Sequence, residues 1–294
     1  MTMSEWLSEA IDFEHATDNE VESCYEKARG LDEGYPSARR VSDTTVIKRV
    51  GFDGEREFAN LSYAYKHVNG KSLIVVPQPV RLVKIRDEWE TDVWYLIMGY
   101  LDGHRLAECH HDQCIKAAST AIMDMHQQTC TLSTVPGPPH SRYDSGFPWG
   151  LDKVQSKWKN VEDLENFMCR RLQDGRLPEA CEALPGALFA HDCALVMNHR
   201  DLSPRNILCL PDGRIGIVDW HSMAFYPPTF DLAAIQHCSL TASDAGERRQ
   251  ALALLRTLLA GGHYLWSNEK EISSQLEKLC AIQRRGISYS LPQS

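Results

Sequence analysis

The sequence predicts an α+β fold with two lobes: a small β-rich lobe over residues 1–100 and a mainly helical lobe over residues 101–294. The first reason is a change of pattern along the chain. Short β-rich runs dominate from Ser37 to Tyr100, and helical periodicity dominates after them. The second reason is that the helical part holds a single hairpin pattern, from Val196 to Trp220. With 294 residues and 43% hydrophobic content, the chain can bury a sizeable core.

The predicted small lobe is an antiparallel sheet with one helix packed on it. Its helix is the stretch 54–69, in which Phe58, Leu61, Tyr65 and Val68 recur at helical spacing. The β-rich runs around this helix are ARRVS, TTVIKRV, LIVVPQPVRLVKI and DVWYLIMGYL. The order β-β-α-β-β favours a small sheet with the helix on one face. The first thirty residues predict an extra amphipathic helix in front of the sheet.

Several segments of the predicted large lobe show helical periodicity. They are QCIKAASTAIMDMHQQ, KVQSKWKNVEDLENFMCRRLQ, PEACEALPGALFAH and GERRQALALLRTLLAGGHYLW. The stretch TVPGPPHSRYDSGFPWG is rich in proline and glycine and is the longest predicted loop. Long loops in compact domains are often binding loops, so we expect this one to help form a ligand pocket.

The chain is acidic, with a formal net charge of -9. Nucleic acids and anionic membranes bind clustered Lys and Arg, so neither is expected as a partner, and a cationic or neutral small molecule fits better. The N-terminus has no positive region followed by an apolar run, so it does not resemble a signal peptide. No apolar stretch approaches the roughly eighteen residues of a membrane span. We therefore expect a soluble cytoplasmic protein.

Ten cysteines are present, without a CxxC pair or a regular spacing, which favours scattered reduced thiols. The densest group of candidate metal ligands is ECHHDQC, with Cys109, His110, His111 and Cys114. Adjacent histidines on a helix point about 100° apart, and the spacing matches no usual zinc motif. We therefore expect the solvated start of a helix here, and no metal.

Two short strands, ILCL and IGIVD, flank the turn sequence PDG in the predicted hairpin. Asp201 comes just before the first strand and Asp219 ends the second, so the hairpin places both carboxylates at one end, with Asn206 between them. Carboxylate and amide oxygens are hard ligands suited to Mg²⁺. The alternative is that all three residues only cap loops and a strand end, and their joint spacing makes the metal site the better interpretation.

These residues resemble a known family. HRDLSPRN has the form H-x-D-x-x-x-x-N, and IVDW follows at the separation that protein kinases use between the catalytic loop and the metal-binding aspartate. The tryptophan after Asp219 and the continuation HSMAFYPPTFDLA are similar to the aminoglycoside phosphotransferase and choline kinase group. The stretches SPRNIL and AFYPP are most similar to the fungal branch of that family. The resemblance is strongest from Val196 to Ala233, extends more weakly over Ser37 to Leu106, and implies a bilobal protein-kinase-like fold.

The resemblance implies ATP and Mg²⁺ as cofactors and gives each matched residue a role. Asp201 is expected to be the catalytic base that orients the acceptor hydroxyl, and Asn206 and Asp219 are expected to be the Mg²⁺ ligands. His199 is expected to hold the loop by hydrogen bonds, and Arg200 stands where this family usually has glycine. Arg205 is open to two interpretations, a substrate or phosphate contact and a surface residue.

An ATP site also needs a cation on the small sheet, fixed by a carboxylate, to hold the α- and β-phosphates. Lys48 lies in the middle of TVIKRV, where a lysine is out of place unless it points into a cleft; the alternative is a solvated edge-strand lysine. Its expected partner is Glu57, which we prefer to Glu55 because it precedes FANLSYAY as the acid of the family pattern does. Met98 and Tyr100, at the end of the last β-run, are expected to contact the adenine.

The sequence departs from the family at several positions. The glycine-rich loop is reduced to Gly34 and a serine, Gly99 stands where the family usually has an acid, and His221 replaces a glutamate that often follows Asp-Trp. Only eleven residues separate Asp219 from Asp231, too few for a peptide-docking segment, so protein is not expected as acceptor. Asp231 is predicted to be a structural acid that caps free N–H groups at a helix start.

Three functions follow from these patterns. The complete set of matched residues favours a Mg·ATP-dependent kinase for a small-molecule hydroxyl. The departures from the family leave a second possibility, in which the fold is reused for non-phosphoryl chemistry such as cyclisation or dehydration in a biosynthetic pathway. A third is a nucleotide-binding pseudokinase that acts as a scaffold, which the presence of every catalytic residue disfavours.

Overall fold

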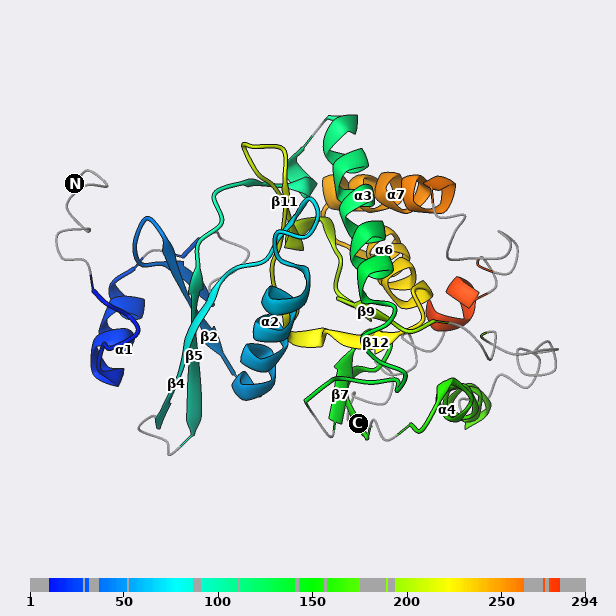
Figure 1. The fold of residues 1–294 in the computed structure, drawn as a ribbon, viewed down its shortest axis with the longest axis horizontal. Helices are drawn as coiled ribbons and strands as arrows, with labels where there is room; N and C mark the ends of the chain where they lie inside the picture. Colours follow the sequence, from blue (N-terminus) through cyan, green and yellow to red (C-terminus); the bar gives the residue numbers. More distant parts are fainter. Residues whose placement is uncertain are drawn as a thin grey trace.

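The structure of the protein is a computed structural model. It describes residues 11–28, 30–31, 37–51, 53–86, 91–109, 111–140, 143–155, 158–174, 189, 194–261, 272 and 275–280. The chain has a β-rich N-terminal region and a mainly helical C-terminal region (Figure 1), which confirms the predicted α+β class. The boundary predicted at residue 100 stays a prediction.

The N-terminal region contains a four-stranded antiparallel sheet with the strand order β1-β2-β5-β4. Its strands are β1 (Ala38–Arg40), β2 (Thr45–Val50), β4 (Pro79–Arg86) and β5 (Asp92–Gly99). Each strand falls inside a predicted β-rich run, except that β4 extends one residue beyond its run, to Arg86. β-branched and aromatic residues are frequent in these runs, and they pack well on a pleated surface.

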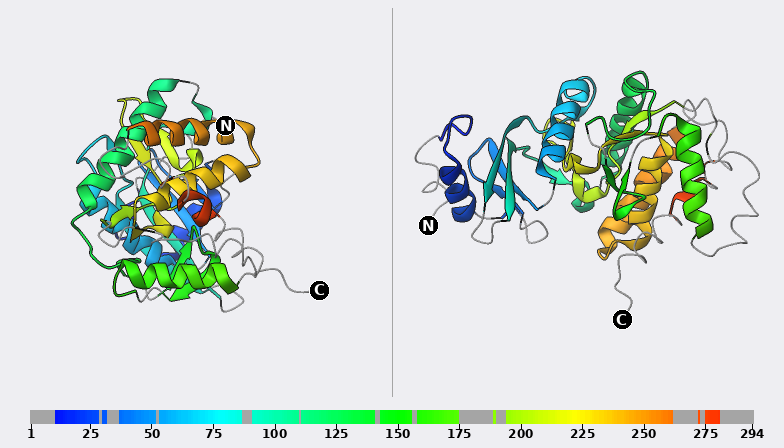
Figure 2. Two further views of the ribbon diagram at one scale, coloured as in Figure 1. Left: turned by 90° about the vertical axis from the view of Figure 1, so that its right-hand side faces the viewer. Right: turned by 90° about the horizontal axis from the view of Figure 1, so that it is seen from below.

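One helix lies against each face of this sheet, as Figure 2 shows. Helix α1 (Asp18–Lys27) begins at a capping box between Thr17 and Glu20 and buries Val21 and Tyr25 against the outer face. Helix α2 (Gly54–Val68) packs on the inner face and joins the main core through Leu61, Ala64 and Val68. Both helices were predicted from the sequence.

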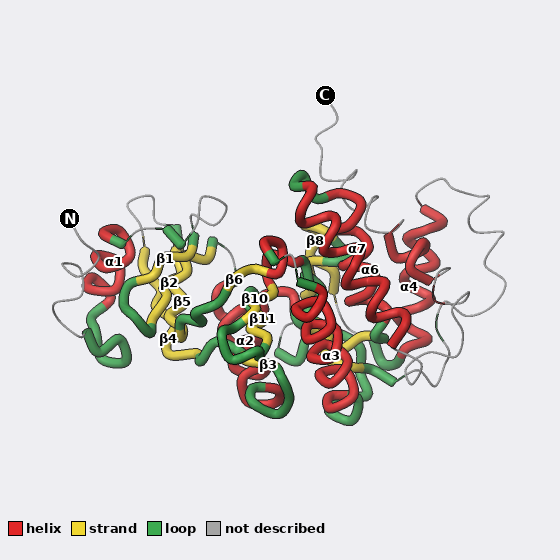
Figure 3. Tube along the Cα trace, turned by 90° about the horizontal axis from the view of Figure 1, so that it is seen from above, coloured by secondary structure: helices red, strands yellow, loops and turns green. Residues whose placement is uncertain are grey.

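The run 73–85 does not form a single strand, contrary to the prediction. Its first part is β3 (Ile74–Val75), which pairs in parallel with β11 (Ile215–Ile217) of the C-terminal region. Pro77 lies between β3 and β4, and Pro79 is the first residue of β4; proline has no backbone N–H to continue a ladder. The second sheet, with the order β3-β11-β10-β6, therefore lies between the small sheet and the helices (Figure 3). Its other strands are β6 (His104–Arg105) and β10 (Ile207–Cys209).

The C-terminal region is mainly helical, and most of its buried residues belong to the main core. Its α-helices among the described residues are α3 (Asp112–Thr129), α4 (Val161–Asp174), α6 (Thr229–Thr241) and α7 (Ala245–Gly261), and residues 275–280 are helical as well. The short strands β9 (Val196–Asn198) and β12 (Ala224–Tyr226) pair with each other in the same region. The helix predicted over residues 178–191 lies outside the described residues, apart from Phe189. Within the described part of the chain, no helix has the length and apolar character to cross a membrane.

A second hairpin lies where the sequence predicted a loop followed by the start of a helix. Strands β7 (Tyr143–Gly146) and β8 (Gly150–Gln155) pair with each other, and Gly146 faces Gly150 across the turn. The helix predicted from residue 153 begins instead at Val161. The tight turn brings the two segments together, and their pairing overrides the local helical periodicity of residues 153–155.

Candidate active site

Lys48 lies in the middle of β2 and projects from the inner face of the small sheet. Its cross-strand neighbour Leu96 and the next residue on the same face, Val50, belong to the main core, whereas Ile47 packs with α1. Successive residues of a strand point to opposite faces, so the lysine is directed away from α1. Its side chain is only 15% exposed, which contradicts a solvated edge-strand lysine.

Lys48 forms two buried ion pairs. Its Nζ donates to Oε1 of Glu57 at 2.7 Å and to Oδ1 of Asp219 at 3.0 Å. Burial alone would lower the pKa of Lys48, but the Asp219 and Glu57 carboxylates raise it above its ordinary value, so the ammonium stays charged. The structure thus brings together three residues predicted for the site. Glu57 is buried in the first turn of α2, whereas the alternative, Glu55, is exposed.

Asp219 links β11 to the short 3-10 helix η4 (Trp220–Ser222) and has a left-handed backbone, with φ 68° and ψ 60°. This conformation costs on the order of 1 kcal/mol in a residue other than glycine. Its Oδ1 also accepts from Nδ1 of His221 at 2.8 Å. Burial would raise the pKa of Asp219, but Lys48 and His221 hold it well below its usual range. Because Oδ1 faces both of these groups, Oδ2 is the oxygen that can take a cation.

Asp201 lies in the segment between β9 and the 3-10 helix η3 (Pro204–Asn206), and its carboxylate is held by two neighbours. Nδ2 of Asn206 donates to the main-chain oxygen and to Oδ2 of Asp201, both at 2.9 Å. Nη2 of Arg205 lies 3.1 and 3.3 Å from the two carboxylate oxygens. The same guanidinium contacts Oε1 of Glu247 on α7 at 3.3 Å, so Arg205 is part of the site and not a bare surface residue.

The β10–β11 hairpin sets Asn206 beside Asp219, as its sequence pattern predicted. Ile207 pairs with Ile217, and the N–H of Val218 donates to the main-chain oxygen of Asn206 at 3.0 Å. The residue after Val218 is Asp219, so both candidate ligands lie at the same end of the hairpin. An amide oxygen and a carboxylate oxygen at one end are donors that suit Mg²⁺.

His199 joins this hairpin end to the Asp201 segment. Its Nδ1 accepts from the N–H of Asp201 at 3.3 Å, so the ring proton must be on Nε2, which donates to the main-chain oxygen of Val218 at 2.9 Å. Burial lowers the pKa of His199, and the ring stays neutral in this arrangement. These hydrogen bonds give it the structural role expected from the sequence.

Asp231 is completely buried in the first turn of α6, but it does not cap its own helix as predicted. Its carboxylate accepts from the N–H groups of His199 at 3.2 Å and Arg200 at 2.6 Å, and it lies 2.9 Å from Nε2 of His126. The N–H of Asp231 itself donates to Oδ1 of Asn198. The carboxylate therefore fixes the backbone that leads into Asp201, because its hydrogen-bond donors are the N–H groups of His199 and Arg200.

The backbone conformation of Arg200 explains why the family usually has glycine at this position. Its φ is 64°, a conformation that glycine adopts without steric cost. Arg200 is held there by a buried pair with Asp144, with nitrogen–oxygen distances of 2.6 and 2.5 Å, and by donation from Nε to the main-chain oxygen of Ser222 at 2.7 Å. Asp144 also accepts from Tyr226 at 2.5 Å and Trp149 at 3.0 Å. Sequence reasoning missed Asp144, because it lies in the stretch predicted as a loop.

Helix α2 is fastened to the turn that follows Asp219. The Nε and Nη2 groups of Arg56 donate to the main-chain oxygen of His221 at 3.2 and 2.9 Å. Nδ2 of Asn60, one turn further along the helix, donates to the same oxygen at 3.1 Å. Glu57 lies between these two residues, so the same contacts that join the lobes also position the partner of Lys48.

Met98 and Tyr100 lie at the end of β5, where the sequence predicted the adenine contacts. The N–H of Gly99 donates to Gln78 at 2.8 Å and that of Tyr100 donates to Thr44 at 2.7 Å, so both groups are already used within the protein. A Cβ on Gly99 would lie 3.3 Å from the Gln78 nitrogen, which is a tight contact. The adenine contacts stay a prediction, and Gly34 lies outside the described residues.

Comparisons with known proteins were consistent with this geometry. No curated protein sequence matches the chain significantly. Among solved structures, spectinomycin phosphotransferase APH(9)-Ia in complex with ADP and spectinomycin is similar, with a TM-score of 0.50, 14% identity and coverage of 88% of this chain and 79% of that one. Aminoglycoside-3'-phosphotransferase of type VIII gives 0.49, 14% identity and coverage of 85% and 91%.

A family model describing the phosphotransferase enzyme family matches residues 40–271, a span that contains Lys48, Glu57, Asp201, Asn206 and Asp219. The resemblance to a fungal branch stays a prediction. The match covers well over half of the 294 residues, and the similarity to spectinomycin phosphotransferase extends to the bilobal kinase-like fold. The chain therefore belongs to the phosphotransferase enzyme family.

Proposed function

We propose that the protein is a Mg²⁺- and ATP-dependent phosphotransferase that acts on a hydroxyl group of a small molecule. The observation that carries this proposal is the position of Lys48, held between Glu57 on α2 and Asp219 at the end of β11. In kinases, a lysine paired with a glutamate of a helix contacts the nucleotide phosphates, and a nearby aspartate binds Mg²⁺. Family membership supports the same reaction class.

Lys48 would bind the α- and β-phosphates of ATP. Its ammonium is charged because the two carboxylates raise its pKa, and Glu57 keeps the side chain extended toward the large lobe. Entry of the phosphates would exchange the Lys48 contact with Asp219 for contacts with phosphate oxygens, while the Glu57 contact is kept. A lysine fixed in this way acts as a positioned charge, which lowers the cost of reorganisation during transfer.

The donors at the hairpin end fit Mg²⁺. They are the amide oxygen of Asn206 and Oδ2 of Asp219, both hard oxygen ligands. Mg²⁺ bound there would neutralise charge on the phosphate oxygens. The Asn206 amide nitrogen donates to Asp201, and Oδ1 of Asp219 accepts from Lys48 and His221, so these contacts orient the ligating oxygens.

Asp201 would accept the proton of the acceptor hydroxyl as the phosphoryl group is transferred. Its carboxylate is fixed by Asn206 and Arg205, and its backbone is fixed through His199 and Asp231. Arg205 lies against this carboxylate, so its guanidinium can also meet a charged oxygen of the reactants. Positioning of the base before the substrate arrives is the main contribution that the loop would make.

A small-molecule acceptor is favoured over a protein. The residues after Asp219 form η4 and β12, and all three residues of β12 are buried against β9 and the main core. This segment therefore offers no extended surface on which a peptide strand could dock. The net charge of -9 favours a cationic or neutral acceptor.

The test is release of ADP from Mg·ATP across a panel of hydroxylated small molecules, including cationic ones, together with calorimetry of Mg·ATP binding. Asp201→Asn should keep nucleotide binding and lower transfer by about 10²–10⁴-fold, as expected for loss of a general base. Asp212→Asn is a matched control, because Asp212 is an exposed carboxylate in the turn of the same hairpin. Conversion of a substrate without ATP, or failure to bind Mg·ATP, would contradict the proposal.

A further inference from the structure

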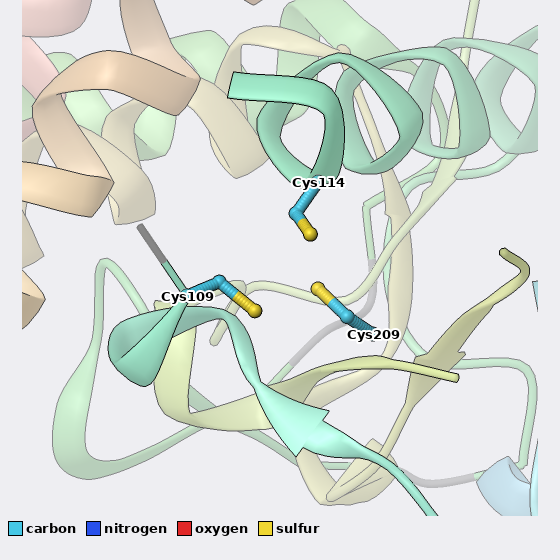
Figure 4. Close-up of side chains that lie close together, drawn as sticks. All are labelled: Cys109, Cys114 and Cys209. Atoms are coloured by element: carbon cyan, nitrogen blue, oxygen red, sulfur yellow. The ribbon is translucent and has the colours of Figure 1, made fainter. Parts of the chain in front are cut away.

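Three cysteine side chains from separate parts of the chain lie close together. Cys109, Cys114 and Cys209 have Sγ atoms that all lie within 4.8 Å of one another, and Figure 4 shows them pointing toward a common centre. Each side chain is half-buried, and none forms a disulfide. From the sequence we expected no metal near Cys109 and Cys114, because the residues next to them match no usual zinc motif. The third sulfur comes from Cys209, on a strand far along the chain.

The three sulfurs are presented by separate, fixed elements. Cys109 follows the 3-10 helix η2 (Leu106–Glu108), and its main-chain oxygen accepts a hydrogen bond from Gln250 on α7. Cys114 lies in the first turn of α3. Cys209 is the last residue of β10 and pairs with His104 on β6. Because the backbone at each position is held by its own contacts, the cluster does not depend on one mobile loop.

The spacing of the sulfurs suits a shared ligand. Zinc binds thiolates at about 2.3 Å, which in tetrahedral geometry separates two sulfurs by about 3.8 Å. Sulfur atoms within 4.8 Å of one another reach that separation by small side-chain rotations. A disulfide needs about 2.0 Å and joins only two of the three.

We propose that Cys109, Cys114 and Cys209 bind one thiophilic divalent cation of the Zn²⁺ class, with water in the fourth position. Thiolates are soft ligands that select such ions over Mg²⁺. A divalent ion offsets most of the charge of three thiolates, and partial exposure of each side chain lets water reach the remaining position. On binding, the thiol protons are released to solvent and three S–metal bonds form.

The pKa shifts of the free thiols fit this replacement of protons by a metal ion. Burial raises the pKa of Cys109 and of Cys209, and the neighbouring thiols raise that of Cys209 further. The Cys109 and Cys209 thiols are therefore neutral in the metal-free protein, and a cation must displace their protons. Affinity for the ion should fall as the pH is lowered. The bound ion would join η2, α3 and β10, and β10 begins directly after Asn206.

The first test is titration of reduced, metal-free, full-length protein with Co²⁺, a spectroscopic substitute for Zn²⁺. One Co²⁺ per chain should bind with a sulfur-to-cobalt charge-transfer band, and Zn²⁺ should displace it. Cys209→Ser should weaken binding by more than about tenfold and reduce the band. Cys24→Ser is the matched control, because Cys24 is a half-buried cysteine on α1, and it should leave both unchanged.

The second test uses the wild-type chain and does not depend on a variant that folds. Alkylation followed by mass spectrometry should show that Zn²⁺ protects Cys109, Cys114 and Cys209 but leaves Cys130, another half-buried cysteine, as reactive as before. The proposal is overturned if reduced protein gives no charge-transfer band, if Zn²⁺ leaves Cys209 unprotected, or if Cys209→Ser binds Co²⁺ like the wild type.

Discussion

Replacement of Arg200 tests how the segment before Asp201 is held. Arg200 and Asp144 are both 0% exposed and form a bidentate pair, and Arg200 also has a left-handed backbone. Removal of one partner of a buried pair costs about 3–5 kcal/mol. We expect Arg200→Gly to lower the free energy of unfolding by about 3 kcal/mol, at the lower end of this range. Asp144 keeps its hydrogen bonds from Tyr226 and Trp149, and glycine adopts the positive φ without steric cost.

Arg200→Ala should be less stable than Arg200→Gly. The left-handed conformation costs alanine about 1–2 kcal/mol, partly offset by the extra freedom of glycine in the unfolded chain, about 0.5–1 kcal/mol. For a chain of 294 residues, with an unfolding entropy of about 2.1 cal/mol/K per residue, 3 kcal/mol corresponds to a fall in Tm of about 5 °C. The assay is thermal unfolding by circular dichroism, with kcat measured in parallel, and kcat should fall because Asp201 follows Arg200 directly.

Two outcomes would refute this reasoning. A Tm of Arg200→Gly within about 2 °C of the wild type would mean that the pair with Asp144 does not stabilise the fold. Equal stability of the alanine and glycine variants would mean that the positive φ carries no cost. As a control, adding Asp144→Asn to Arg200→Gly should recover about 1 kcal/mol or more, because it removes the buried charge that the arginine faced.

Three further predictions concern the candidate site. Lys48→Ala should lower kcat/KM by about 100-fold or more, and it should also lower stability, because it leaves the Glu57 and Asp219 carboxylates without the ammonium they face. Glu57→Gln should give a smaller loss of kcat/KM; equal losses would contradict the positioning role of Glu57. Lys66→Ala, on the same helix as Glu57 and exposed in its last turn, should leave kcat/KM unchanged. Burial lowers the pKa of His199 below 6.5, so the unfolded state binds more protons and stability falls as the pH drops below 6.5. His199→Gln should remove up to about 1.4 kcal/mol per pH unit from this slope, measured by urea unfolding between pH 5 and 7, and identical slopes would contradict the burial of a neutral ring.

The parts of the site that could be predicted from sequence are those encoded by local spacing. Asn206 and Asp219 lie at one end of a single hairpin, with Asp201 just before it, and the place of Lys48 in the middle of a β-run indicated that its side chain points into a cleft. Strand β3 could not be assigned correctly, because a short apolar run fits either sheet and only pairing with β11 decides between them. The β7–β8 hairpin was missed for a similar reason, since proline and glycine indicate a turn without saying whether strands flank it.

The supporting residues could not be predicted, because their partners lie far along the chain. Asp144 faces Arg200 across 56 residues of sequence, and Asp231 serves the segment before Asp201 instead of its own helix. The glycine preference at Arg200 was the one local signal, since an arginine there requires something to hold its backbone. Cys209 gave no such signal, because a single cysteine in a strand has the pattern of an ordinary core residue.

The position of β3 and β6 has a consequence for how the chain can fold and be divided. These strands, which lead into and out of the small sheet, form the two edges of the sheet whose middle is the β10–β11 hairpin. That sheet therefore cannot be completed until strands more than a hundred residues apart have met, and such long-range pairing slows folding. An isolated C-terminal fragment that starts after β6 would expose both edges of the hairpin, and unpaired edges of this kind recruit other chains. The two lobes should thus form one cooperative unit during synthesis, completed only after β11 has emerged from the ribosome.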